Sequence, residues 1–220
     1  MEETVLNNRV NNERKIWDRS AKYYDRNTKR FEKAYQLSVE KTLEFVNNES
    51  KILEVGCGTG IITFEVAGFV KEIEAIDLSE KMIQIAKEKQ KQKGVNNINF
   101  QVGDAYDLEY PDKAFNVVLL FNTLHVFKSP ENVIKEIHRI LKQKGILITA
   151  TDCYAEKTSF KTSLMHMLEK LAKSLGIIKY LSFYKKEDLE VLIEGYGFQI
   201  KETKTLFHDP VNYLVLGEKL

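Results

Sequence analysis

Three glycines at every second position constrain the fold of this chain more than any other feature. They close the run Ile52-Leu53-Glu54-Val55-Gly56-Cys57-Gly58-Thr59-Gly60, in which the β-rich stretch Lys51 to Val55 comes first. Glycines let the backbone turn sharply and approach a ligand closely before a helix begins near Ile61. A second apolar run, Ile73 to Ile76, ends in Asp77, roughly 20 residues further on, where a carboxylate can reach a ribose bound over such a loop. The pattern predicts a site for a nucleotide-type cofactor.

The glycine spacing separates two classes of cofactor. The dinucleotide fingerprint is G-x-G-x-x-G, whereas this chain has Ile61 where the third dinucleotide glycine would fall. A nicotinamide or a flavin is therefore disfavoured. With Glu54 in the acidic place, the segment resembles instead the first motif, E/D-x-G-x-G-x-G, of class I S-adenosylmethionine-dependent methyltransferases. From the loop alone, a tight strand-to-helix turn without a ligand is the alternative.

Three later segments agree with this resemblance. Ile98 to Val102 is a strand candidate ending in Gly103-Asp104-Ala105, where the family places an acid and a backbone N–H against adenine. Ala114 to Leu120 leads into Phe121-Asn122-Thr123-Leu124-His125, which is similar to the family's fourth motif. Leu141 to Ile148 resembles the turn into the fifth strand, with Gln143 in place of the usual proline. The resemblance implies S-adenosylmethionine as the cofactor and these cofactor-binding residues: Tyr24, Glu54, Gly56, Cys57, Gly58, Gly60, Asp77, Leu78, Met82, Asp104, Ala105, Phe121 and Asn122.

The order of strand and helix signals predicts an α/β fold, because the two alternate along the chain. The resemblance implies a Rossmann-like, seven-stranded, mostly parallel sheet with helices on both faces and an antiparallel last strand. Gln199 to Leu206 and Val211 to Leu216 fit the final strand pair. We expect one domain over residues 1–220, made of a helical cap (1–45), the cofactor-binding core (46–153), a helical lid insertion (154–184) and a C-terminal helix with the strand pair (185–220).

Two segments lie outside the predicted core. Trp17 and Tyr24 are seven residues apart, which places them on one face of an N-terminal helix. Ala21-Lys22-Tyr23-Tyr24-Asp25 resembles the A-x-x-Y-D signature of ubiquinone- and menaquinone-type small-molecule methyltransferases, and simple packing of an aromatic stripe on the sheet is the alternative. Phe160 to Leu175 has an apolar helical face directly after the fifth strand, where open α/β sheets bind ligands. We expect this insertion to be a lid, or else the interface of a homodimer.

Composition limits the partners and the compartment. The 33 basic and 32 acidic residues give a net charge of +1, which does not favour nucleic acid, and the basic segments 9–33 and 87–93 are interpreted as solvated helix faces. Cys57, Cys153 and the four histidines show no ligand spacing, so we expect no metal. No apolar run reaches the ~20 residues of a membrane span, and the acidic N-terminus has no apolar signal core, which predicts a cytoplasmic protein.

The motifs favour methyl transfer to a small, partly apolar acceptor by in-line displacement. Phe121-Asn122-Thr123-Leu124 is not the D/N-P-P-Y/F motif of enzymes that methylate planar amines or amides. A general base is needed only if the acceptor carries its proton at neutral pH. His125 is the candidate for that base, with Tyr24, Tyr154 and His166 as further candidates. Three other functions stay open: an NAD-type oxidoreductase, a non-catalytic S-adenosylmethionine-binding module, and an RNA methyltransferase.

Overall fold

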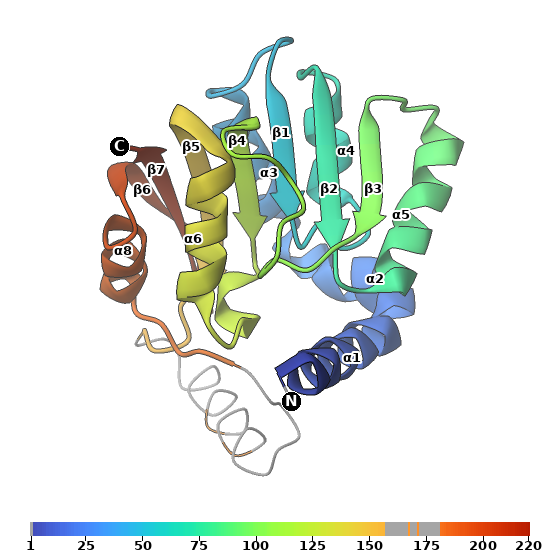
Figure 1. Ribbon diagram of the computed structural model, residues 1–220, viewed down its shortest axis with the longest axis horizontal. Coiled ribbons are helices and arrows are strands. Elements are labelled where there is room, and N and C mark those ends of the chain that lie inside the picture. Colours follow the sequence, from blue (N-terminus) through green and yellow to red (C-terminus); the bar gives the residue numbers. More distant parts are fainter. Residues whose placement is uncertain (1, 157–166, 168–170, 172–180) are drawn as a thin grey trace.

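A seven-stranded sheet forms the centre of the computed structural model, which describes residues 2–156, 167, 171 and 181–220 (Figure 1). The strand order is β3-β2-β1-β4-β5-β7-β6. The strands pair in parallel except that β7 runs antiparallel to both β5 and β6. The predicted fold class, including its antiparallel last strand, is confirmed. The strands are β1 (Lys51–Val55), β2 (Glu72–Asp77), β3 (Ile98–Val102), β4 (Phe115–Phe121), β5 (Leu141–Asp152), β6 (Phe198–His208) and β7 (Val211–Lys219).

Helices cover both faces of the sheet and create two hydrophobic cores. On one face, α6 (Pro130–Ile140) and α8 (Lys186–Glu194) bury their apolar stripes, and α6 begins at a proline whose fixed φ suits the first helical position. On the other face lie α3 (Glu32–Leu43), α4 (Ile61–Ala67) and α5 (Glu80–Lys93). Both faces of the central strands are therefore buried, which explains why β4 reads as a nearly continuous apolar run.

The strand order reverses between β1 and β4, and this reversal positions the site. The chain steps from β1 outward through β2 to β3, and then returns to place β4 on the other side of β1. Connections that leave two neighbouring parallel strands in opposite directions open a crevice at the carboxyl ends of those strands. Asp77 ends β2 and Asn122 follows β4, so both lie at this edge of the sheet.

The N-terminal segment lies across the same edge (Figure 1). It consists of α1 (Glu2–Ser20), a 3₁₀ turn (Ala21–Tyr23), α2 (Tyr24–Thr28), a second 3₁₀ turn (Lys29–Phe31) and then α3. The prediction that Trp17 and Tyr24 lie on one face of a single helix is wrong, because the helix ends between them. The Ser20 hydroxyl bonds back to the Trp17 carbonyl, and Asp25 is drawn towards the core by Thr59 and Lys89.

Most of the predicted lid, residues 154–184, lies outside the described residues, as does His166. Met167 and Leu171 are described, and their side chains are exposed. Within the described part of the chain, no helix is both long enough and apolar enough to cross a membrane.

Glu54 is a carboxylate buried inside the sheet. It lies on the central strand β1, is 3% exposed, and accepts a 2.6 Å hydrogen bond from the Thr63 hydroxyl of α4. Burial raises the pKa of Glu54 to about 7, and the hydrogen bond from Thr63 only partly opposes this shift. Because the pKa is higher in the folded than in the unfolded chain, the carboxyl group stabilises the fold most at low pH. That contribution is lost as the pH rises through about 7.

We therefore expect Glu54→Gln to stabilise the ligand-free protein at pH 8, by up to ~3 kcal/mol, and to change its stability little at pH 5. The glutamine keeps an acceptor for Thr63 but cannot ionise. Urea unfolding at both pH values measures the difference, with the exposed Glu65→Gln on α4 as the matched control. A variant that is equally destabilised at both pH values would contradict the assigned ionisation of Glu54.

Candidate functional site

The glycine loop after β1 is held close to two other segments. Gly56 has φ +74°, and a Cβ there would lie 2.3 Å from Thr123 Cγ2. Gly58 has φ +55°, and a Cβ there would lie 3.3 Å from Tyr24 Cε1. Both positions require the left-handed conformation and the close approach that glycine allows. The loop is therefore packed between the end of β4 and the start of α2.

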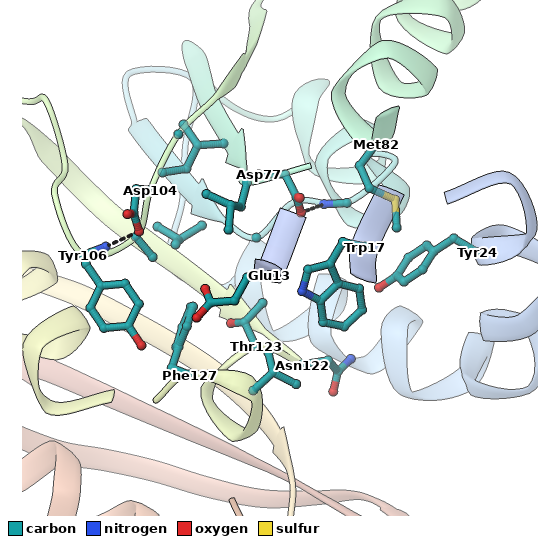
Figure 2. A pocket seen from close by; sticks show the side chains of 18 residues that line it. Glu13, Trp17, Tyr24, Asp77, Met82, Asp104, Tyr106, Asn122, Thr123 and Phe127 are labelled. Atoms are coloured by element: carbon teal, nitrogen blue, oxygen red, sulfur yellow. Dashed lines mark hydrogen bonds between the residues drawn. The ribbon is translucent and has the colours of Figure 1, made fainter. Parts of the chain in front are cut away.

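Asp77 connects this loop to the end of β2 (Figure 2). Its Oδ2 accepts a 2.9 Å hydrogen bond from the Gly58 N–H, and its Oδ1 accepts a 2.8 Å bond from the Ser79 N–H. Burial raises the pKa of Asp77 to about 6, and the two backbone hydrogen bonds oppose this shift. A carboxylate has about four lone-pair sites, so acceptor capacity remains for a ligand.

A cavity of about 720 Å³, open mouth included, lies at the carboxyl ends of the parallel strands. Much of this volume is open solvent, and the centre of a water molecule can occupy about 80 Å³ of it. The cavity is lined by nine of the residues that the sequence predicts for the cofactor: Tyr24, Gly56, Gly58, Asp77, Leu78, Met82, Asp104, Ala105 and Asn122. The structure thus brings together side chains from the N-terminal segment, β2, α5 and the loops after β3 and β4.

Four other predicted cofactor residues do not line this cavity. Glu54 and Cys57 are buried beside the loop, and burial raises the pKa of the Cys57 thiol well above its usual value. Gly60 precedes α4 and would meet Phe64 and Phe100 if it carried a Cβ. Phe121 belongs to the core on the α4 face of the sheet. These four residues pack beneath the cavity wall.

Nine further lining residues were not predicted for the site: Glu13, Trp17, Val55, Ile76, Gly103, Tyr106, Thr123, Val126 and Phe127. The basic segment 9–33 was predicted to be a solvated helix face, and this prediction is wrong for Arg9 and Glu13. The side chains of Arg9 and Glu13 are each only 13% exposed, and they form a 3.0 Å ion pair with each other. Arg9 also pairs with Asp104 and lies 4.3 Å from the centre of the Tyr106 ring. Trp17, an aromatic residue on an otherwise charged helix, was a signal in the sequence that this helix covers a site.

His125, the predicted candidate base, lies in a short 3₁₀ turn (Leu124–Val126) and does not line the cavity. It is 7% exposed, and its ring meets that of Tyr154 edge-on at 5.4 Å. Burial lowers the pKa of His125, although the charge of Asp152 acts in the opposite direction. Within the described part of the chain, Nδ1 has no hydrogen-bond partner. The imidazole is therefore neutral at pH 7.

A chain of polar side chains leads away from the cavity at Asn122. Its Oδ1 accepts a 2.7 Å hydrogen bond from Asn212 Nδ2, which also donates to Asp152 Oδ1 at 2.7 Å. The Tyr154 hydroxyl donates to Asp152 Oδ2 at 3.2 Å. Asn122 adopts φ +54°, a conformation that asparagine tolerates better than most residues. The ends of β4, β5 and β7 thus meet in one polar cluster: Asn122, Asp152, Tyr154 and Asn212.

The arrangement suits an adenosyl ligand better than a metal ion. In the part of the chain that the structure describes, no group of three or more His, Cys, Asp or Glu residues is placed to hold a metal. The cavity instead offers carboxylates at the ends of β2 and β3 as acceptors for hydroxyl and amino groups. Apolar and aromatic side chains lie between them.

Comparisons with known proteins identify the family. Residues 47–208 match the model of the methyltransferase domain family. A stretch of 123 residues is 28% identical to an uncharacterized methyltransferase, YcgJ, of Bacillus subtilis, and it spans about half of that protein, 48%. Over 208 residues the chain is 27% identical to a demethylmenaquinone methyltransferase of Tropheryma whipplei, covering 88% of this chain and 86% of that one.

Among solved structures, a methyltransferase dependent on S-adenosylmethionine from Aquifex aeolicus superposes with a TM-score of 0.71 at 17% identity. The match covers 92% of this chain and 98% of that one, and at this identity it supports the fold alone. The family match, together with the confirmed strand order, decides against the oxidoreductase alternative. The chain belongs to the methyltransferase domain family and is a class I S-adenosylmethionine-dependent methyltransferase.

Proposed function

We propose that this enzyme transfers the methyl group of S-adenosylmethionine to a small, partly apolar acceptor by in-line displacement. One observation carries the proposal. The cavity runs from the carboxylate of Asp77 to Asn122, where the polar cluster at the ends of β4, β5 and β7 begins. A single bound molecule of cofactor can therefore have its ribose at one end and its reactive sulfur facing the other.

In this proposal Asp77 accepts hydrogen bonds from the ribose hydroxyls. Gly56 and Gly58 allow the methionine part to approach the backbone, because neither has a side chain in the cavity. The adenine extends towards Leu78, Asp104 and Ala105, which follow the ends of β2 and β3. Glu54, Cys57, Gly60 and Phe121 support these residues from beneath.

The chemistry makes modest demands on the protein. Methyl transfer breaks the bond from sulfur to the methyl carbon as the acceptor lone pair attacks from the opposite side. Alignment of the two reactants and exclusion of water supply much of the rate enhancement, since effective molarities correspond to ~7–11 kcal/mol. Tyr24 and Trp17 cover the cavity from the N-terminal segment and can exclude water.

The acceptor is proposed to bind beside the polar cluster defined above. Its hydroxyl, amide and carboxylate groups can orient an acceptor's polar group, while Val126 and Phe127 offer apolar contact. The T. whipplei relative is named as a demethylmenaquinone methyltransferase, which supports a small-molecule acceptor. The neutral, buried His125 has the protonation state of a base, and we propose that role only for an acceptor that carries its proton at neutral pH.

A direct assay tests the proposed function. The purified protein is incubated with S-adenosylmethionine and, in parallel, with demethylmenaquinol, simple phenols, carboxylic acids and unfractionated tRNA. We expect release of S-adenosylhomocysteine and a mass gain of one methylene unit in a small-molecule acceptor. Methylation of tRNA alone would contradict the proposal.

We expect Asp77→Ala to weaken S-adenosylmethionine binding at least roughly tenfold, because two hydrogen bonds from ribose hydroxyls to a carboxylate are lost. Isothermal titration calorimetry measures the change. Asp107→Ala is the matched control, since Asp107 is an exposed carboxylate near the same edge that does not line the cavity. Equal affinities of the Asp77 variant and the wild type would remove Asp77 from the site.

The raised pKa of Asp77 predicts that cofactor binding depends on pH. Ribose hydroxyls and the positive sulfonium favour the ionised carboxylate, so binding lowers the pKa of Asp77 from about 6 and releases a proton. Affinity should therefore rise as the pH increases from 5 towards 7 and then level off. Titrations in buffers with different ionisation enthalpies count the released protons. Asp77→Ala should remove this dependence of affinity on pH. If the dependence is unchanged in the variant, another titratable group causes it.

A further inference from the structure

Helix α1 is held over the cavity by polar contacts with the start of α5. Arg14 Nε donates to the Leu78 carbonyl at 3.2 Å, and its guanidinium pairs with Glu80 at 2.8 Å. One turn later, Asp18 Oδ1 accepts bonds from the Ser79 hydroxyl at 2.6 Å and the Lys81 N–H at 3.2 Å. These contacts follow Glu13 in the sequence and fix the face of α1 that meets the cavity.

Glu13 presents a free carboxylate oxygen to the cavity. Its Oε2 is paired with Arg9, whereas Oε1 is buried and has no hydrogen-bond partner among the described residues. In Figure 2 the Glu13 carboxylate lies among Trp17, Tyr106 and Phe127, which also line the cavity. A buried, unpaired carboxylate oxygen is unfavourable, so a ligand that donates a hydrogen bond to it gains affinity.

Each oxygen of the Asp104 carboxylate has one donor within the protein. Its Oδ1 accepts a 3.1 Å hydrogen bond from the Tyr106 N–H, and its Oδ2 pairs with Arg9. Arg9 in turn lies over the Tyr106 ring and pairs with Glu13. Asp104, the residue that the family resemblance places against adenine, is thus held in place by Arg9. The neighbouring oxygen that lacks a donor belongs to Glu13.

We propose that Glu13 is a specificity-determining residue that accepts a hydrogen bond from the 6-amino group of the adenosyl moiety. The inference rests on the proposed placement of the ribose at Asp77 and the adenine near Asp104. Adenine has a donor at this position, whereas hypoxanthine has a carbonyl oxygen that a carboxylate repels. Glu13 therefore selects adenosyl over inosyl ligands, and α1 contributes directly to recognition of the base.

Titration of S-adenosylhomocysteine and S-inosylhomocysteine tests this role. We expect the wild-type protein to bind the adenosyl ligand at least tenfold more tightly. Glu13→Gln can donate to the inosyl carbonyl as well as accept from the amine, so the ratio of the two affinities should fall at least tenfold. A residue that only holds α1 in place would change both affinities by the same factor.

Two further variants complete the test. Glu80→Gln weakens the anchor of α1 without touching the cavity, and it should leave the ratio of affinities unchanged. Thermal unfolding of the ligand-free variants shows whether each is folded. An unchanged ratio in Glu13→Gln, or a ratio abolished by Asp104→Asn but not by Glu13→Gln, would overturn the proposal. Failure of the wild type to bind either ligand would instead contradict the adenosyl site itself.

Discussion

The bridge that Asp77 makes between the Gly58 and Ser79 amides organises the cofactor side of the structure. One carboxylate joins the loop after β1, the end of β2 and the residue that caps α5, where the Ser79 hydroxyl accepts from the Met82 N–H. The loop can then adopt positive φ at its glycines and leave an open cavity above them. Removing Asp77 would therefore disturb the ligand contact and the loop together.

Helices α1 and α2 contact this core through charged and hydroxyl groups, whereas α3 packs on the hydrophobic core of the α4 face. Asp18 reaches the start of α5, and Asp25 bonds to Thr59 and pairs with Lys89. Such contacts are individually modest in water, and they exchange readily with solvent compared with a packed apolar face. Among the described side chains of α1 none belongs to either hydrophobic core, so polar contacts with the start of α5 hold Trp17 and Glu13 at the cavity.

The sheet and the glycine loop could be predicted from the sequence, because the residues that set the local conformation there also pack in the core or form the loop. The glycines and Asp77 are required by the loop itself, and the apolar runs become β1, β2 and β4. It was harder to predict which residues face the cavity and which face the core. Gly56 lines the cavity, whereas its neighbour Cys57 is buried in the core. In the same way, Asn122 lines the cavity, whereas Phe121 lies in the core. Glu13 could not be found at all. A carboxylate on a charged helix looks solvated until the sheet edge beneath it is known.

The two halves of the site differ in what would change their specificity. In the proposed cofactor half, Gly56, Gly58 and Asp77 also shape the loop after β1, so substitutions there would disturb the loop as well. The proposed acceptor half depends on side chains that meet only in the folded chain, with Asn122, Asp152 and Asn212 contributed by three different strands or the loops beside them. We therefore expect the choice of acceptor to diverge within this fold while S-adenosylmethionine binding is retained, with the proposed contact of Glu13 to the base adding to that of Asp77 to the ribose.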